Sequence, residues 1–369
     1  MPNANSRDVR WTSDLAVLLA CAAALWLLPL ASAAPPAPVD VIFDTDMALD
    51  VDDVGALALL HALADRGECH LLAVGVSESA RHDNGMWGPP MADVVNTYFG
   101  RPDIPIGVFR GPHQQTADKG RYAEKTAAAF PHDLRRGTDA PEAYKLYRQV
   151  LAGRPDHSVT MLSVGFLTNL DALLRSGPDE SSPLDGVALV RRKVKEWSCM
   201  GGRFPSSGEQ GEFNLATYPE ATAYVLAHWP TPATFAGFEI GVKVKTGARL
   251  IREHGPRTSP VARAYLEYTG GPARESWDQT AALYAVRGLG HAGQAYFTAV
   301  TRGHNRFELA AAPPTRRGAP SFSRNTWVSE PDSEHAYLVE AMAPERLAEV
   351  IEGLMMHRPA RGTPTPSSR

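Results

Sequence analysis

The chain has 369 residues, of which 44% are hydrophobic and 21% are charged, and its formal net charge is −4 at pH 7. This mildly acidic balance excludes a nucleic acid or a membrane surface as a partner held by bulk charge. The length suits one large domain or two smaller ones.

The first 33 residues have the pattern of a targeting segment. Two arginines precede an apolar stretch at 15–33, which ends in the small-residue cleavage pattern Ala31-Ser32-Ala33. We therefore expect residues 1–33 to be a signal peptide and the mature protein to be secreted or periplasmic, with no membrane segment after cleavage. An uncleaved anchor and lipidation at Cys21 are the alternatives.

Short apolar runs then alternate with helical patterns along the chain. Strand-like runs stand at 39–43, 70–77, 104–109, 158–165, 194–202 and 233–241. Helical patterns stand at 54–67, 92–100, 166–177 and 219–229. Two cysteines remain after cleavage, Cys69 and Cys199, and we expect two buried thiols rather than a disulfide.

The alternation of strands and helices predicts the fold class. Parallel neighbours need a crossover long enough for a helix, so we expect an α/β fold. It is a single domain at 39–357 with an open, mostly parallel central sheet and helices on both faces. Residues 200–215 and 301–333 are rich in glycine, proline and polar residues and predict long loops, and 358–369 predicts a disordered tail.

Five carboxylates follow the first strand within ten residues. They are Asp44, Asp46, Asp50, Asp52 and Asp53. Ligands of an open α/β sheet bind outside the carboxyl ends of its strands, and a helix start there favours negative charge. The helix dipole is weaker than the repulsion among several close anions, so we expect a metal ion. All-oxygen ligands favour Ca²⁺ or Mg²⁺.

Two other motifs with closely spaced aspartates compete with this interpretation. An EF-hand needs a glycine at its sixth position and an acidic residue at its twelfth, and this segment has neither. A phosphoryl-transfer enzyme of the haloacid dehalogenase type also opens with D-x-D after an apolar strand, with Asp44 as nucleophile and Asp46 as acid/base. Met47-Ala48 fits that motif poorly, and no later acidic pair stands out at a strand end.

Four segments in chain order resemble the inosine–uridine-preferring nucleoside hydrolase family. DTDMALDVDDVGALALLHAL resembles its D-x-D-x-x-x-D-D signature with the following helix, and SVGFLTNLDALL resembles its TGPLTN-like turn. GEFNLATYPEAT resembles its AEFN–D–PEA segment, and SWDQTAALYAV resembles its HDP–A helix start. The C-terminal HAYLVEAM and IEGLM fit its last strand and helix. The resemblance implies a nucleoside hydrolase-like fold and the hydrolysis of N-glycosidic bonds.

The sequence departs from the family pattern in two places. In the family signature the D-D pair follows the D-x-D motif, and in this chain the pair stands two residues farther from Asp44-x-Asp46. We align the pair with Asp52 and Asp53 because the helix begins directly afterwards. The role of Asp50 stays open. Members that hydrolyse inosine and uridine carry a proton-donating histidine where this chain has Trp277, as in the purine-preferring branch. Stacking on a base is worth about 1–3 kcal/mol, so we expect a purine-tolerant site.

The resemblance implies a Ca²⁺ ion held by Asp46, Asp53, Asp278 and the backbone carbonyl of Val164. Such a set leaves positions for water and two sugar hydroxyls. Asp46 is also the expected catalytic base, taking a proton from the attacking water, whose pKa the ion lowers. The alternative for these aspartates is capping of a helix N-terminus. We expect Asp44 to be structural and to accept from backbone amides beneath the site.

The candidates for substrate contacts are Asp52, Glu212, Asn214, Asp278, Trp277, Trp87 and His82. Asp52 would bond a ribose hydroxyl and favour an oxocarbenium-like transition state, with a solvated helix-start charge as the alternative. Glu212 and Asn214 lie two apart on extended chain and can reach one sugar, with loop hydrogen bonding as the alternative. Trp87 and His82 follow the second strand and could face the same mouth, with packing as the alternative.

The expected activity is Ca²⁺-dependent hydrolysis of ribonucleosides to base and ribose. The partner is a small molecule, and the family commonly forms dimers or tetramers. Two rivals stay open: a hydrolase of another sugar-like compound on the same metal site, and a non-catalytic nucleoside- or pentose-binding protein. The altered spacing and the missing histidine are the features that keep these rivals open.

Overall fold

The computed structural model describes residues 37–112, 121–310 and 322–359. The expected signal peptide and nearly all of the expected tail lie outside these ranges. The described chain from Pro38 onward forms one compact unit, an α/β domain. Among the described residues, no helix is long and apolar enough to span a membrane.

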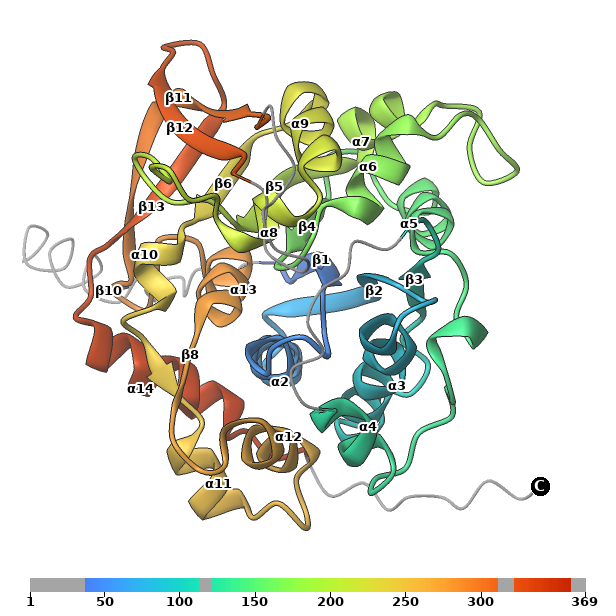
Figure 1. Ribbon diagram of the computed structural model, residues 1–369, viewed down its shortest axis with the longest axis vertical. Coiled ribbons are helices and arrows are strands. Elements are labelled where there is room, and N and C mark those ends of the chain that lie inside the picture. Colours follow the sequence, from blue (N-terminus) through green and yellow to red (C-terminus); the bar gives the residue numbers. More distant parts are fainter. Residues whose placement is uncertain (1–36, 113–120, 311–321, 360–369) are drawn as a thin grey trace, which may run out of the picture. The chain divides into compact units, whose positions relative to one another are not determined.

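A nine-stranded sheet forms the centre of the domain, in the order β12-β11-β13-β6-β5-β4-β1-β2-β3 (Figure 1). Its parallel strands are β1 (Val39–Thr45), β2 (Cys69–Ser79), β3 (Ile106–Phe109), β4 (Val159–Ser163), β5 (Val194–Met200), β6 (Ala233–Ala236) and β13 (His335–Glu340). β11 (Phe297–Glu308) and β12 (Arg324–Ser329) add an antiparallel extension. The predicted open, mostly parallel sheet is confirmed.

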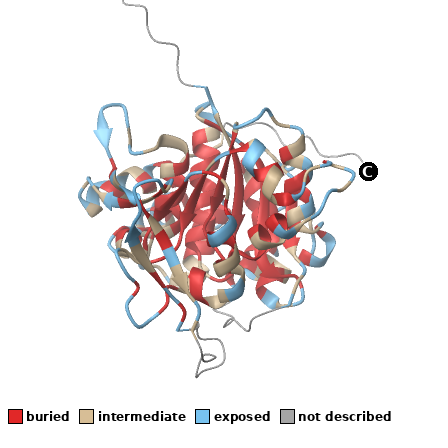
Figure 2. Ribbon diagram, turned by 90° about the horizontal axis from the view of Figure 1, so that it is seen from above, coloured by how far each residue is buried: buried red, intermediate tan, exposed pale blue. Residues whose placement is uncertain are grey.

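Helices cover both faces of the sheet. One face carries α2 (Asp52–Asp65), α3 (Asp83–Tyr98), α12 (Pro260–Thr269), α13 (Trp277–Arg287) and α14 (Pro344–Met355). The other carries α5 (Ala143–Ala152), α6 (Thr168–Arg175), α7 (Gly186–Lys193) and α9 (Pro219–His228). Successive side chains of a strand point to opposite faces, so Phe43 packs in the first core and Ile42 in the second. The strands are buried between these layers (Figure 2).

Smaller elements connect these layers. The short helices are α4 (Tyr122–Ala127), η1 (Gly137–Asp139), α8 (Phe213–Thr217), α10 (Phe238–Gly241) and α11 (Ala248–His254). Two small ribbons pair β7 (Lys245–Thr246) with β8 (Arg274–Glu275), and β9 (Gly290–His291) with β10 (Gln294–Ala295). Cys69 and Cys199 are free and buried, which confirms the expected pair of thiols.

Three sequence predictions differ from the structure. The expected loop at 301–333 contains most of β11 and all of β12. Its strands are hard to see in the sequence because buried positions are polar: Asn325 Nδ2 donates to Asn305 Oδ1 at 3.0 Å. The expected sixth strand ends at Ala236, and FEIG forms α10. α3 starts at Asp83, ahead of two prolines that it contains, because packing on β2 outweighs the local preference.

The strand order places a topological switch between β1 and β4. The chain runs outward from β1 to β2 and β3, then returns to add β4, β5 and β6 on the other side. Crevices at such points, beyond the carboxyl ends of the strands, are where open α/β sheets bind ligands. Asp46 follows β1 and Val164 follows β4, so both stand at this crevice.

Candidate active site

A pocket of about 230 Å³ opens at the carboxyl ends of β1, β4 and β5. Eight of the ten predicted site residues line it: Asp46, Asp52, Asp53, Val164, Glu212, Asn214, Trp277 and Asp278. Six residues that we did not predict complete the lining: Leu49, Asp50, Met200, Phe213, Phe238 and Arg274. Carboxylates and aromatic rings therefore share one cavity, the combination that a sugar joined to a flat base requires.

Trp87 and His82 lie outside this lining. His82 is the residue before the first turn of α3, and Trp87 lies within that helix, partly buried and packed against the core of the α2–α13 face. The packing alternative therefore describes Trp87 better than the predicted substrate contact. Loop position after β2 was the only sequence signal for these two residues. The connection between β2 and α3 is short, so His82 is its last residue and Trp87 already lies in the helix.

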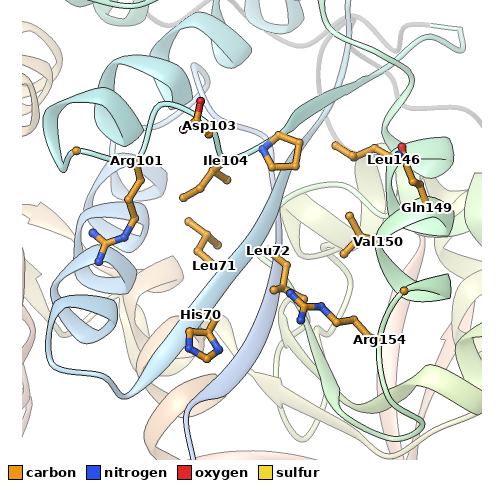
Figure 3. Close-up of a pocket in the computed structure, with 13 residues that line it drawn as sticks. His70, Leu71, Leu72, Arg101, Asp103, Ile104, Leu146, Gln149, Val150 and Arg154 are labelled. Atoms are coloured by element: carbon orange, nitrogen blue, oxygen red, sulfur yellow. The ribbon is translucent and has the colours of Figure 1, made fainter. Parts of the chain in front are cut away.

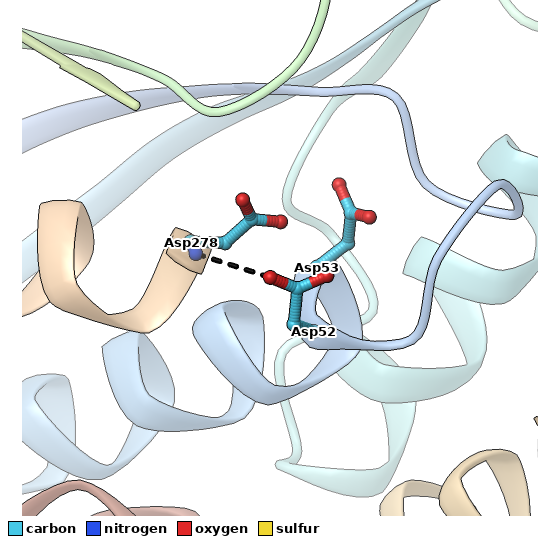
Figure 4. Close-up of side chains that lie close together, drawn as sticks. All are labelled: Asp52, Asp53 and Asp278. Carbon is cyan, nitrogen blue, oxygen red and sulfur yellow. Dashed lines mark hydrogen bonds between the residues drawn. The ribbon is translucent and has the colours of Figure 1, made fainter. Parts of the chain in front are cut away.

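Asp52 joins two helices at the pocket floor. α2 and α13 pack side by side (Figure 1). One carboxylate oxygen of Asp52 accepts hydrogen bonds from the backbone N–H groups of Trp277 at 3.1 Å and Asp278 at 3.2 Å; the second of these bonds is drawn in Figure 4. These amides are the unsatisfied donors at the start of α13. Asp52 therefore positions both residues, a role that the sequence alone did not suggest.

Three carboxylates meet at this floor. Asp52, Asp53 and Asp278 each offer an oxygen within 4.8 Å of the others, and all three are buried (Figure 4). Burial raises the pKa of Asp53 to about 7 and the pKa of Asp278 well above its ordinary value, and neighbouring carboxylates raise the pKa of Asp278 further. Anions this close destabilise one another unless a cation or protons compensate them.

Asp46 stands beside this cluster. It lines the same pocket, and burial followed by the charges of Asp53, Glu78 and Asp52 raises its pKa well above the ordinary value. Glu78 is fully buried at the end of β2 and was missed in the sequence, where a single glutamate in a strand carries no signal.

The donor set fits a hard divalent cation. Asp53 is 1% exposed; Thr45 Oγ1 donates to its Oδ1, while its Oδ2 has no hydrogen-bond partner among the described residues. A buried carboxylate oxygen without a partner is costly, and a coordinated ion would satisfy it. The surrounding donors are all oxygens, which is the chemistry of Ca²⁺ and Mg²⁺ sites.

A glycine brings the β4 loop against Asp46. A Cβ on Gly165 would lie 2.4 Å from the Asp46 nitrogen and 2.8 Å from its carboxylate carbon, so only glycine permits this approach. The neighbouring carbonyl of Val164 thereby reaches the pocket. Asn214 Nδ2 donates to that carbonyl at 2.7 Å and to the Met200 carbonyl at 3.3 Å.

Glu212 is occupied by backbone amides. Its Oε1 accepts from Asn214 N–H at 3.0 Å, and its Oε2 accepts from Leu215 N–H at 3.1 Å and Gly202 N–H at 2.9 Å. Glu212 therefore caps α8 and ties it to the loop after β5, and in this way fixes Asn214 in the pocket. The hydrogen-bonding alternative describes this side chain at least as well as a direct ribose contact.

Asp44 lies beneath the pocket in a side-chain network. Its Oδ2 accepts from the Tyr147 hydroxyl and from Asn169 Nδ2 at 2.8 Å. The expected bonds to backbone amides are therefore wrong, although the residue is fully buried and structural. Burial raises the pKa of Asp44 to about 7.

An aromatic wall closes the other side of the pocket. The rings of Trp277 and Phe238 stack with centroids 5.4 Å apart and planes 29° apart, and Trp277 Nε1 donates to the Phe238 carbonyl at 3.1 Å. The guanidinium of Arg203 covers Phe238 at 3.9 Å from the ring centroid. Trp277 is therefore held rigidly beside the carboxylates, where a flat ring can pack against the wall.

A larger hollow of about 930 Å³ lies beside the amino-terminal half of β2 (Figure 3). Its floor is apolar, with Leu71, Leu72 and Ile104, and its lining contains one carboxylate, Asp103. None of the predicted site residues lines it. It also lies at the amino-terminal end of β2, whereas open α/β sheets bind ligands beyond the carboxyl ends of their strands. The chemistry therefore belongs to the smaller pocket.

The site is thus a pocket of buried carboxylates at the switch point of an α/β sheet. The family of inosine-uridine preferring nucleoside hydrolases matches residues 41–343 of the sequence, and the chain belongs to this family. The protein is thus a hydrolase of N-glycosidic bonds, in a family that depends on a metal ion.

Solved structures share this fold. An inosine-guanosine nucleoside hydrolase matches with a TM-score of 0.61 and 18% identity, covering 86% of this chain and 97% of its own. A purine-preferring ribonucleoside hydrolase from Gardnerella vaginalis matches with 0.58 and 14%, covering 86% and 99%. The type III effector protein XopQ, solved with adenosine diphosphate ribose, matches with 0.62 and 18%, covering 87% and 94%. A comparison with curated protein sequences gave no match.

Proposed function

We propose that this protein cleaves the N-glycosidic bond of purine ribonucleosides and that its metal is Ca²⁺. The observation that carries the proposal is the single pocket that joins four buried aspartates to the Trp277–Phe238 stack. Asp46, Asp53, Asp278 and the Val164 carbonyl would hold the ion. When bound, Ca²⁺ would lower the pKa of a coordinated water and orient sugar hydroxyls.

The residues around the sugar have separate tasks in this proposal. Asp46 accepts the proton of the attacking water as general base. Asn214 bonds a ribose hydroxyl, and Asp52, one of whose oxygens is committed to α13, contributes negative charge near the oxocarbenium-like transition state. Glu212 holds Asn214 in place through its three amide bonds. Trp277 packs against the face of the base.

Two rival functions share the same pocket. One is hydrolysis of another sugar-like compound, and the other is binding of a nucleoside or pentose without turnover. A panel of purine and pyrimidine nucleosides, assayed for free ribose with and without chelator, separates all three. We expect chelator-sensitive ribose release from purine nucleosides. Binding without release would support the binding protein, and release from none of the panel would contradict the proposed substrate.

Replacement of Trp277 by alanine tests the stacking role. Loss of one aromatic–base contact costs about 1–3 kcal/mol, so we expect KM for inosine to rise about tenfold to a hundredfold with a smaller change in kcat. The matched control is Trp229→Phe, because Trp229 packs in the opposite core and donates to Thr231. An unchanged KM in the Trp277 variant would contradict stacking.

The affinity for Ca²⁺ should depend on pH. Burial raises the pKa of Asp53 to about 7 and the pKa values of Asp46 and Asp278 well above their ordinary values. In the ion-free protein these groups hold protons at low pH, which the ion must displace. We expect the Kd for Ca²⁺, from isothermal titration calorimetry, to be about tenfold or more weaker at about pH 5.5 than at about pH 8. A constant Kd would show that other groups bind the ion.

We also propose that residues 1–33 direct the protein out of the cytoplasm, where it would act on external nucleosides. The support is the apolar stretch at 15–33 and the Ala31-Ser32-Ala33 pattern at its end. N-terminal sequencing of the protein recovered from the extracytoplasmic fraction should begin at Ala34. A protein that retains residues 1–33 would contradict this.

A further inference from the structure

Asp50, whose role the sequence left open, forms a two-bond ion pair with Arg274. Arg274 Nε donates to Asp50 Oδ1 at 3.1 Å, and its Nη2 donates to Asp50 Oδ2 at 2.5 Å. Both side chains line the pocket. Asp50 lies in the segment that separates this chain from the family spacing, and Arg274 lies on β8, three residues before Trp277. A bidentate pair of this kind fixes the plane of the guanidinium.

Arg274 stands at the aromatic side of the pocket. Its guanidinium carbon lies 5.2 Å from the Trp277 ring centroid and 5.5 Å from that of Tyr268. Its Nη1 donates to Glu275 Oε2 at 2.9 Å. A guanidinium has five N–H groups and cannot accept a hydrogen bond, so these three bonds leave two donors. A flat ring packed on Trp277 would present its edge to them.

The charges around Arg274 decide what kind of acceptor suits it. Asp50 and Glu275 already compensate its positive charge, and the aspartates of the pocket add further negative charge. A phosphate would meet net negative charge here, whereas a neutral carbonyl oxygen would meet only the donors. Among the fourteen lining residues Arg274 is the single cation, and the lining also contains the apolar residues Leu49, Met200 and Phe213.

We propose that Arg274 is a specificity residue, which selects bases carrying a carbonyl oxygen on the edge away from the sugar, and that Asp50 is its positioning residue. This rests on the proposed function. The favoured substrates are 6-oxopurine nucleosides such as inosine, because the oxygen accepts from Arg274. Adenosine offers an amino group at the same edge, so two donors would face each other and one of them would lose its partner.

The test compares inosine with adenosine in the Ca²⁺-loaded protein as kcat/KM for ribose release. The Kd of each nucleoside is measured by calorimetry in the Asp46→Asn background, where slow turnover leaves the nucleoside intact. We expect inosine to be preferred by about tenfold or more in both quantities. Arg274→Met should bring the ratio close to one, mainly by weakening inosine, and Asp50→Asn should lower it part of the way. Lys245→Met is the matched control, since Lys245 pairs with Glu275 from outside the pocket, and it should keep the wild-type ratio.

An inosine preference that survives Arg274→Met, or equal use of both nucleosides by the wild type, overturns the proposal. A preference for inosine 5′-monophosphate over inosine also overturns it, because that would make Arg274 an anion site. Arg274→Lys, which keeps the charge but not the two-bond geometry, serves if the methionine variant does not fold, and should lower the ratio. If neither nucleoside is cleaved but inosine binds more tightly through Arg274, the proposed hydrolysis fails and the selection stands.

Discussion

Replacement of Asp46 by asparagine should lower kcat by about 10²–10⁴-fold, because the variant lacks the general base that deprotonates the attacking water. The fold should survive. Burial and the charges of Asp53, Glu78 and Asp52 raise the pKa of Asp46, so the ionised side chain is repelled in the ion-free protein. A neutral amide removes that repulsion. We therefore expect the ion-free variant to unfold at a temperature no lower than the wild type.

The two readouts separate the catalytic role of Asp46 from a structural one. Steady-state ribose release gives kcat, and calorimetric unfolding of chelator-treated protein gives the stability. Asp171→Asn is the matched control, because Asp171 pairs with Arg175 on α6 outside the pocket, and it should leave kcat unchanged. An Asp46 variant that keeps kcat within tenfold of the wild type would show that another group takes the proton.

Substitution of Asp53 or Asp278 by asparagine should remove the metal. Both carboxylates belong to the buried cluster, and Oδ2 of Asp53 has no other partner among the described residues. Removing a residue that only hydrogen-bonds to a metal ligand commonly lowers the metal affinity by about 10–100-fold. Loss of a direct ligand should therefore weaken Ca²⁺ binding by about a hundredfold or more. Ribose release at micromolar Ca²⁺ should fall in parallel.

A helix cap away from the pocket provides the control for this pair. Asp185 caps α7 by accepting a hydrogen bond from Ala188 N–H at 2.8 Å. Helix capping is the alternative role for Asp53 and Asp278, so Asp185→Asn shows the effect of changing an aspartate that only caps a helix. It should leave the Kd for Ca²⁺ unchanged. If the Asp53 and Asp278 variants also bind Ca²⁺ with wild-type affinity and lose only stability, both residues are caps and the proposed site is wrong.

The sheet could be predicted where apolar strands alternate with helices along the sequence. It could not be predicted where a strand has polar residues at buried positions and depends on contacts with distant segments. β1 to β6 each contain a run of buried and mostly apolar residues, as buried parallel strands do, although Lys195 and Glu196 interrupt the start of β5. β11 and β12 are different, because Asn305 and Asn325 fill buried positions with a hydrogen-bonded polar pair. Nothing in a single sequence shows that two such residues will meet.

The site was predictable to the extent that its residues stand directly after a strand or in the first turn of a helix, within recognisable segments. Asp46, Asp53 and Asp278 meet those conditions and line one pocket. Their partners do not: Arg274 lies on a two-residue strand, and Phe238 in a helical turn expected to be extended. The local roles of Asp52 and Glu212 also depend on amides from other segments, which only the packing of α13 and the β5 loop brings within reach.

A crystal structure of the protein with Ca²⁺ and ribose tests the central claim most directly. We predict one ion at about 2.3–2.6 Å from oxygens of Asp46, Asp53 and Asp278 and from the Val164 carbonyl, with two ribose hydroxyls completing its coordination. Side chains remote from one another, or an ion bound elsewhere while this pocket stays empty at saturating Ca²⁺, would contradict the account.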